Sequence, residues 1–263
     1  MKIVKLIVEH LLNDLVATLP EGFAVNSIRK FYLHFCSALP FAMLARAGET
    51  VIHIGCWKIE TVSAWSRLVG PRGKVIIIEP VEENINLLSF EASRRSLDNV
   101  IFINSGVWSS RCTLPLMMHK GTWYKDGDSG EKALNAGQAF MHSMVKSAST
   151  YIDEETPEHN VSYEEKMIRA DTLDNLLQEA GVSKADHIHI TTTGSEFEIL
   201  SGMECLLTQK GLRVMVSATF LRKSDSRPSF EAVEKLLRER GLVTCLGKRM
   251  AVRHGRYIFA YTR

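Results

Sequence analysis

The sequence has 263 residues, of which 45% are hydrophobic and 24% charged, and this length fits one large α/β domain or two small ones. Seven prolines and 17 glycines exclude collagen-like and low-complexity chains. The formal net charge of +2 argues against a dedicated nucleic-acid binder, which would be strongly basic.

The five cysteines are widely spaced and include no Cys-x-x-Cys pair, so they match neither a disulfide framework nor a structural zinc site. They are typical of reduced thiols. The apolar N-terminus is interrupted by Glu9, His10 and Asp14 before it reaches the length of a signal-peptide core. No stretch approaches the roughly 18 apolar residues of a membrane-spanning helix. We therefore expect a cytoplasmic protein without membrane contacts.

Residues 1–47 show helical periodicity, and we expect a helical extension there that packs near a ligand cleft. In residues 48–263, short apolar runs alternate with amphipathic segments, as in a parallel sheet built from β-α-β units. The predicted strands are Val51–Ile54, Lys74–Ile78, Val100–Ile103, His187–Ile190, Arg213–Ser217, Leu242–Cys245 and Tyr257–Tyr261.

Residues 119–165 interrupt this alternation. They are rich in turn residues and carry a net charge of −5, whereas residues 206–263 carry +9. We expect residues 119–165 to form an irregular insertion that acts as a mobile lid. The basic C-terminal fifth, including a predicted charged hairpin turn at Lys248–Arg256, is either a solvated surface or a site for an anionic partner.

Two strand ends point to a cofactor that contains adenosine. Gly55 follows the first predicted strand, and a glycine allows a sharp turn and a close backbone approach to a ligand at the N-terminus of the next helix, predicted at 61–68. Glu79 ends the second strand, where a carboxylate can accept hydrogen bonds from ribose hydroxyls. The Gly-x-Gly-x-x-Gly motif of NAD-linked dehydrogenases is absent, which disfavours that class.

Several segments resemble a class I S-adenosylmethionine (SAM) methyltransferase of the FkbM type. The similar segments are Ser66–Pro80, Glu83–Leu88, Ala170–Leu177 and Ala185–Met203. The resemblance covers roughly residues 45–220. It implies a Rossmann-like α/β fold with a seven-stranded, mainly parallel sheet, helices on both faces and an antiparallel C-terminal strand at Tyr257–Tyr261.

The sequence departs from the family pattern at four positions. In the motif Asp-x-Gly-x-x-x-Gly, His53 replaces the acid and Ile59 replaces the second glycine. Thr191 and Thr193 replace the two acids of Asp-Val-Glu-Gly, whereas Glu196 is retained. The first and fourth strands are neighbours in this fold, so we expect His53 to lie beside the strand that carries His187 and His189.

The resemblance implies SAM as the cofactor. The residues expected to contact it are Gly55, Cys56, Glu79, Pro80, Ser105, Trp108 and Thr191. Trp108 follows the third strand, where the family's loop approaches the adenine. The candidate catalytic residues are His53, His189 and Glu196. No metal site is predicted, because the histidines have no identifiable third ligand.

Three functions stay open. The first is O-methylation of a hydroxyl on a small metabolite or glycan, and this acceptor class comes from the resemblance alone. The second is a catalytically inactive scaffold or partner subunit with a methyltransferase fold. The third is an RNA-modifying methyltransferase, because the C-terminal fifth is basic. The apolar helical stretches before residue 48 suit either a core or the surface of a homo-oligomer.

Overall fold

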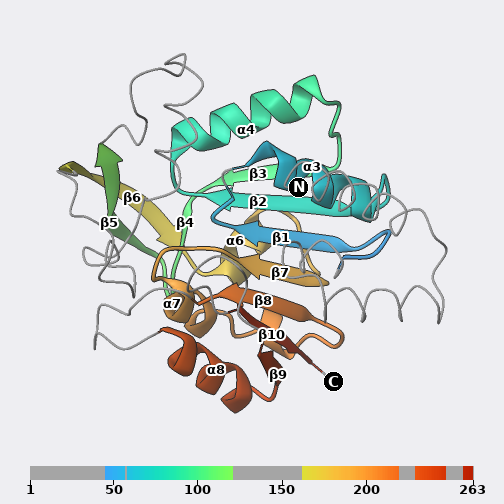
Figure 1. Cartoon of the computed structure of the whole chain (residues 1–263), viewed down its shortest axis with the longest axis vertical. Helices are drawn as coiled ribbons and strands as arrows, with labels where there is room; N and C mark the ends of the chain where they lie inside the picture. The colour runs from blue at the N-terminus through green and yellow to red at the C-terminus, as the bar shows by residue number, and fades with distance from the viewer. Residues whose placement is uncertain (1–44, 57, 121–161, 219–228, 247–256, 263) are drawn as a thin grey trace, which may run out of the picture.

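The computed structural model describes residues 45–56, 58–120, 162–218, 229–246 and 257–262. Within these residues a central sheet of seven strands stands beside a smaller sheet of three strands (Figure 1). The predicted N-terminal helices, the centre of the predicted lid and the Lys248–Arg256 run lie outside the described residues.

The central sheet has the predicted topology. Its strands are β1 (Thr50–Ile54), β2 (Lys74–Glu79), β3 (Val100–Asn104), β7 (His187–Ile190), β8 (Arg213–Ser217), β9 (Val243–Leu246) and β10 (Tyr257–Tyr261). Their order across the sheet is β3-β2-β1-β7-β8-β10-β9. Strands β1, β2, β3, β7 and β8 run parallel, and β10 is antiparallel to both β8 and β9. The mainly parallel sheet with an antiparallel C-terminal strand is therefore confirmed.

The parallel strands are almost uninterrupted apolar runs because both of their faces are covered. In β2, every residue after Lys74 is buried. Successive side chains point to opposite faces of a strand. Accordingly, Ile76 and Ile78 belong to one apolar cluster, and Val75 and Ile77 belong to the other.

Helices cover both faces of the sheet, as predicted. They are α3 (Ile59–Val69), α4 (Glu82–Arg94), α6 (Leu173–Glu179), α7 (Glu196–Ser201) and α8 (Ser229–Glu239). Trp65 of α3 and Leu88 of α4 pack on one face, whereas Leu177 of α6, Ile199 of α7 and Val233 of α8 pack on the other. Among the helices described, none has both the length and the apolar character needed to cross a membrane.

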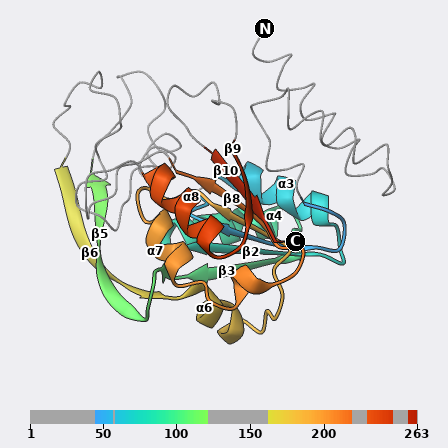
Figure 2. The ribbon, with the colours of Figure 1, turned by 90° about the horizontal axis from the view of Figure 1, so that it is seen from below.

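The smaller sheet contains β4 (Gly106–Val107), β5 (Cys112–Lys120) and β6 (Ser162–Asp171), in the order β4-β6-β5. Strands β5 and β6 form an antiparallel hairpin that extends away from the central sheet (Figure 2). Leu116 and Ile168 of the hairpin pack against Val81, which follows β2. The prediction of an irregular insertion at 119–165 is wrong at both ends, because residues 119–120 and 162–165 pair as strands.

Candidate functional site

The turn at Gly55 follows β1 and contacts the carboxyl ends of its two neighbours, β2 and β7. Gly55 has a φ of 80°, a conformation that favours glycine, and its N–H donates to the Ile78 carbonyl at 3.0 Å. A Cβ at this position would lie 2.5 Å from the Thr191 carbonyl oxygen. Glycine is therefore required because the backbone after β7 passes close by. The Gly55 N–H, part of the backbone predicted to approach a ligand, is already hydrogen-bonded to β2.

Glu79 lies at the carboxyl end of β2, beside this turn. It is buried, and its Oε1 accepts hydrogen bonds from the Val81 N–H at 3.3 Å and from Asn84 Nδ2 at 3.1 Å. Asn104 Nδ2 donates to the carbonyls of Glu79 and Pro80 and so holds the turn. No hydrogen bond described in the structure uses Oε2 of Glu79. Burial raises the pKa of Glu79 to about 7, although the two hydrogen bonds lower it.

His53 lies on the α3 side of the sheet. Its Nδ1 accepts a hydrogen bond from Trp65 Nε1 at 3.2 Å, and its Nε2 lies 2.8 Å from Thr191 Oγ1. Burial lowers the pKa of His53 to about 3, so the ring is neutral at physiological pH. Both ring nitrogens are engaged within the protein, which supports a structural role for His53 rather than a role as base.

His189 is the register partner of His53, and their ring centroids lie 4.2 Å apart. His187 lies on the same face, 5.3 Å from Trp65 between ring centroids. Both histidines are buried, and burial lowers the pKa of each well below 6.5. No group of metal-ligand side chains that could hold an ion occurs among the described residues. His189 is thus part of a neutral layer beneath α3.

Glu196 begins α7 and folds back on the loop that follows β7. Its Oε1 accepts from Thr192 Oγ1 and from the Gly194 N–H, both at 3.1 Å. Its Oε2 is buried and has no hydrogen-bond partner among the described residues. Burial raises the pKa of Glu196 to about 7, and the nearby Glu198 adds to that rise. A carboxyl group of this kind changes its charge near neutral pH.

The predicted site residues fall into two groups. The first group lies at the carboxyl ends of β1, β2 and β7 or in the segments that follow them, and it contains His53, Gly55, Cys56, Glu79, Pro80, His189, Thr191 and Glu196. This is the edge where doubly wound sheets bind ligands. The Cys56 thiol is buried there and its pKa is raised to about 12, chiefly by burial, so it is not a reactive nucleophile.

A family model for the FkbM methyltransferase domain matches residues 48–243, which is most of the chain. The chain belongs to the FkbM methyltransferase family. No curated protein shows a significant sequence match.

Solved structures with the same fold include an FkbM methyltransferase from Methylobacillus flagellatus KT, with 12% sequence identity and a TM-score of 0.50. The match covers 97% of this chain but 60% of that protein, so this chain spans three fifths of its length. Fibrillarin from Aeropyrum pernix, solved with natively bound SAM, shares 12% identity at a TM-score of 0.49, over 88% of this chain and 74% of that one. At 12% identity, the match to the FkbM methyltransferase structure shows the fold alone, which is the Rossmann-like methyltransferase fold.

Three of the four departures from the FkbM pattern have a packing explanation. His53 and Thr191, which replace two acids of the pattern, are hydrogen-bonded to each other across β1 and β7. Ile59, which replaces a glycine, begins α3 and packs against the apolar cluster around Trp65. Neutral partners have therefore replaced charged ones in a buried position, where an unpaired carboxylate would be costly.

Two side chains of the Thr-Leu-Asp motif at residues 172–174, within the segment Ala170–Leu177 that resembles the family, each cap a helix. Thr172 Oγ1 accepts from the Asn175 N–H at 3.2 Å and so caps α6. Asp174 accepts from the N–H groups of Glu204, Cys205 and Leu206, at the start of a 3₁₀ turn. The resemblance indicated the segment Ala170–Leu177 without giving these side chains a role.

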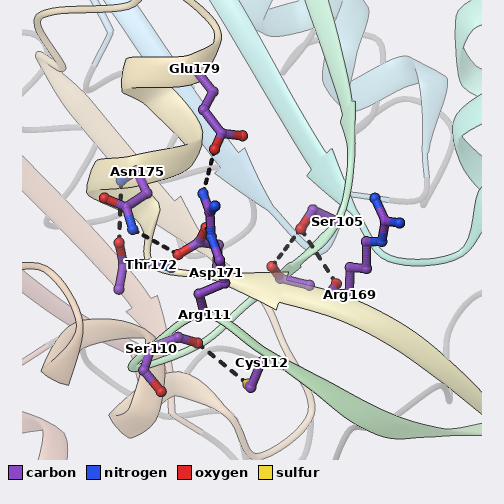
Figure 3. Close-up of polar contacts among 10 residues, drawn as sticks. Ser105, Ser110, Arg111, Cys112, Arg169, Asp171, Thr172, Asn175 and Glu179 are labelled. Atoms are coloured by element: carbon purple, nitrogen blue, oxygen red, sulfur yellow. Dashed lines mark hydrogen bonds and ion pairs between the residues drawn. The ribbon is translucent and has the colours of Figure 1, made fainter.

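Next to this motif, Asp171 joins the end of β6 to the loops around it (Figure 3). Its side chain accepts from Asn175 Nδ2 at 2.8 Å and pairs with Arg111, which also pairs with Glu179. Its backbone carbonyl accepts from the Trp108 N–H at 2.8 Å. The segment that carries Trp108 is thereby attached to the hairpin.

Trp108 and Ser105 belong to the second group of predicted site residues. A Cβ at Gly202 would lie 2.6 Å from the Trp108 carbonyl oxygen, so this segment packs against the end of α7. Ser105 Oγ donates to the Gly106 carbonyl at 2.9 Å. No hydrogen bond described for either residue reaches Gly55 or Glu79. Adenine stacking on Trp108 stays a prediction.

Sequence reasoning missed two residues that shape the site. Trp65 could have been found as an apolar position of α3, but its hydrogen bond to His53 depends on tertiary packing. Asn84 lies in the first turn of α4, five positions after Glu79, and this spacing lets its side chain reach back to the carboxylate.

A groove of about 690 Å³ lies at the opposite end of the sheet, near the amino ends of β2 and β3. Its lining includes Arg67, Arg72, Lys74 and Arg95. Helices α3 and α4 end here, and cations near helix C-termini compensate the negative end of the helix dipole. This groove is separate from the predicted cofactor site.

Proposed function

We propose that this chain is a SAM-dependent methyltransferase that methylates a hydroxyl group of a small metabolite or glycan. The observation that carries the proposal is Glu79, a buried carboxylate at the ligand-binding edge of the sheet with one oxygen available to a ligand. Family membership supports the reaction class.

The residues at this edge fit the parts of SAM. Oε2 of Glu79 would accept hydrogen bonds from the ribose hydroxyls, while Asn84 and the Val81 N–H hold Oε1 in place. Among the described residues, no side-chain hydrogen bond caps the N-terminus of α3, so the first N–H groups of this helix could donate to the carboxylate of the methionine moiety. When bound, SAM would supply an electrophilic methyl group.

The chain contributes chiefly by placing the acceptor, because positioning alone can supply much of the acceleration of a group transfer. Glu196 suits the role of base better than His53 or His189, because its pKa of about 7 lies near physiological pH. The histidines are held neutral by burial. Oε2 of Glu196 is buried in this structure, so Glu196 would take the hydroxyl proton of the acceptor only after the loop that follows β7 exposes this oxygen.

The acceptor side of the site borders the β5–β6 hairpin. Leu116 and Ile168 pack on Val81, two residues after Glu79, so the hairpin begins at the edge of the proposed cofactor site. The hairpin leads into residues 121–161, and their role as a lid stays part of this proposal.

The experiment is a calorimetric titration of SAM into wild-type protein, Glu79→Ala and Glu82→Ala. Loss of a carboxylate that receives two hydroxyl bonds costs about 1.5–3 kcal/mol, or roughly 10- to 150-fold in affinity. Glu82 is an exposed acid in the same segment, so Glu82→Ala is the matched control and should bind as wild type does. Equal affinity of all three proteins would overturn the role of Glu79.

A second candidate function is a scaffold or partner subunit without turnover. It is favoured by the neutral His53–Thr191 pair, which stands where the FkbM pattern has two carboxylates. If folded wild-type protein binds no SAM at millimolar ligand, this second function replaces the first.

A further inference from the structure

Trp65 fixes the protonation pattern of His53. An indole N–H can only donate a hydrogen bond, so the Trp65 Nε1–H requires a lone pair on His53 Nδ1, 3.2 Å away. A neutral imidazole carries its single proton on the other nitrogen. The proton of His53 therefore lies on Nε2. Burial supports this neutral state by lowering the pKa of the ring to about 3.

The direction of the next two bonds follows. His53 Nε2–H donates to Thr191 Oγ1 at 2.8 Å. The Thr191 hydroxyl then has its own proton to donate, and the Gly55 carbonyl at 3.2 Å and the Ile54 carbonyl at 3.3 Å are the acceptors within reach. One directed chain thus runs from α3 through β1 and β7 to the Gly55 turn.

The geometry points to this chain of Trp65, His53 and Thr191 as a positioning relay for cofactor binding, an inference that rests on the proposed function. Gly55 is held on one side by the Ile78 carbonyl, and on the other by the Thr191 hydroxyl. Glu79 directly follows Ile78. A shift of the Gly55 turn would therefore change the surface beside the carboxylate that receives the ribose.

Every group in the relay is neutral, so, unlike a pair of carboxylates, the relay does not change its charge near neutral pH. Its hydrogen bonds persist across the pH range in which Glu79 gains and loses its proton. Trp65 and Thr191 act as positioning residues, because they work through the Gly55 turn rather than by contact with a reacting group.

The test uses the full chain and three variants. Trp65→Phe keeps an aromatic side chain, although a smaller one, and removes the donor. Thr191→Val removes the hydroxyl at nearly constant shape. Thr191→Ser retains the hydroxyl and should recover most of the affinity lost in Thr191→Val. Thr113→Val, on the exposed side of β5, is the control for the Thr-to-Val change itself. SAM affinity is measured by calorimetry, and His53 is observed by NMR of protein labelled with ¹⁵N in histidine.

In wild-type protein the NMR spectrum should show His53 as the neutral tautomer protonated on Nε2. Trp65→Phe and Thr191→Val should each weaken SAM binding roughly 2- to 13-fold, the range for one net hydrogen bond. Variants that bind SAM as tightly as wild type, or a proton on Nδ1 of His53, would overturn the relay. Failure of wild-type protein to bind SAM would instead overturn the proposed function, so the two failures can be told apart.

Discussion

Glu79 and Glu196 are buried carboxyl groups that receive hydrogen bonds from neutral donors only, among the interactions described. Burial raises the pKa of each to about 7. Their charge therefore depends on pH in the physiological range, whereas the charge of the neighbouring histidines does not.

The pH dependence of cofactor binding should follow Glu79. The ionised carboxylate accepts from ribose hydroxyls, so binding favours the ionised form and should weaken up to about tenfold between pH 8 and pH 6. Glu79→Gln has no proton to gain, and its weaker affinity should vary little over this range. Calorimetry at pH 6, 7 and 8 measures both. The same pH slope in wild type and variant would contradict the assignment.

Glu196 is tested by Glu196→Gln, which retains an oxygen that can accept from Thr192 and Gly194. Without a base, turnover should fall about 10²- to 10⁴-fold, while SAM affinity changes little. The assay follows S-adenosylhomocysteine formation with the most active member of a panel of hydroxyl acceptors. Unchanged turnover would remove Glu196 from the mechanism.

The ends of the central-sheet strands could be predicted from the sequence to within one residue, but the contacts between side chains could not. Glu79 is at the end of a buried apolar run, and such runs indicate parallel strands. Gly55 was interpreted as a ligand contact, whereas its missing side chain makes room for the Thr191 carbonyl. That close approach joins residues more than a hundred positions apart, and no local pattern indicates it.

At the scale of elements, the central sheet was predictable because its strands are short apolar runs, of which β1, β2, β7 and β8 are buried on both faces. The β5–β6 hairpin was not, since Pro115 interrupts β5 and charged residues fill β6. Proline is tolerated because β5 is an edge strand of its sheet. Leu116 and Ile168 provide too short an apolar pattern to indicate a strand pair.

The cap provided by Asp174 should contribute measurably to stability. Asp174→Ala removes the acceptor for three backbone N–H groups and should cost about 1–2 kcal/mol, in the upper range for helix caps. Urea unfolding followed by circular dichroism measures the change. Asp98→Ala, an exposed acid in a loop, is the control and should be near neutral. Equal stability of the two variants would show that the cap is not needed.

For the whole molecule, buried histidines and buried glutamates couple folding to pH in opposite directions. The pKa values of His53, His187 and His189 are lowered in the folded state, so their contribution is lost as pH falls below about 6.5. The pKa values of Glu79 and Glu196 are raised, so their contribution is present near pH 4.5 and lost as pH rises toward 7. The two effects offset each other between these values.

Removal of the two glutamates should expose the effect of the histidines. The double variant Glu79→Gln with Glu196→Gln should lose stability more steeply than wild type as pH falls from 6.5 to 4.5, because the opposing contribution is gone. Unfolding midpoints in urea at several pH values measure both slopes. A variant slope equal to or shallower than that of wild type would contradict the opposing signs.

The most direct test of the proposed cofactor site is a crystal structure of the protein with S-adenosylhomocysteine. We predict that the adenosine lies across the carboxyl ends of β1 and β2, with the ribose hydroxyls within hydrogen-bond distance of Glu79 Oε2. Binding elsewhere, such as in the groove at the amino ends of β2 and β3, would contradict this site. Absence of the ligand at millimolar concentration would contradict the proposed activity as well.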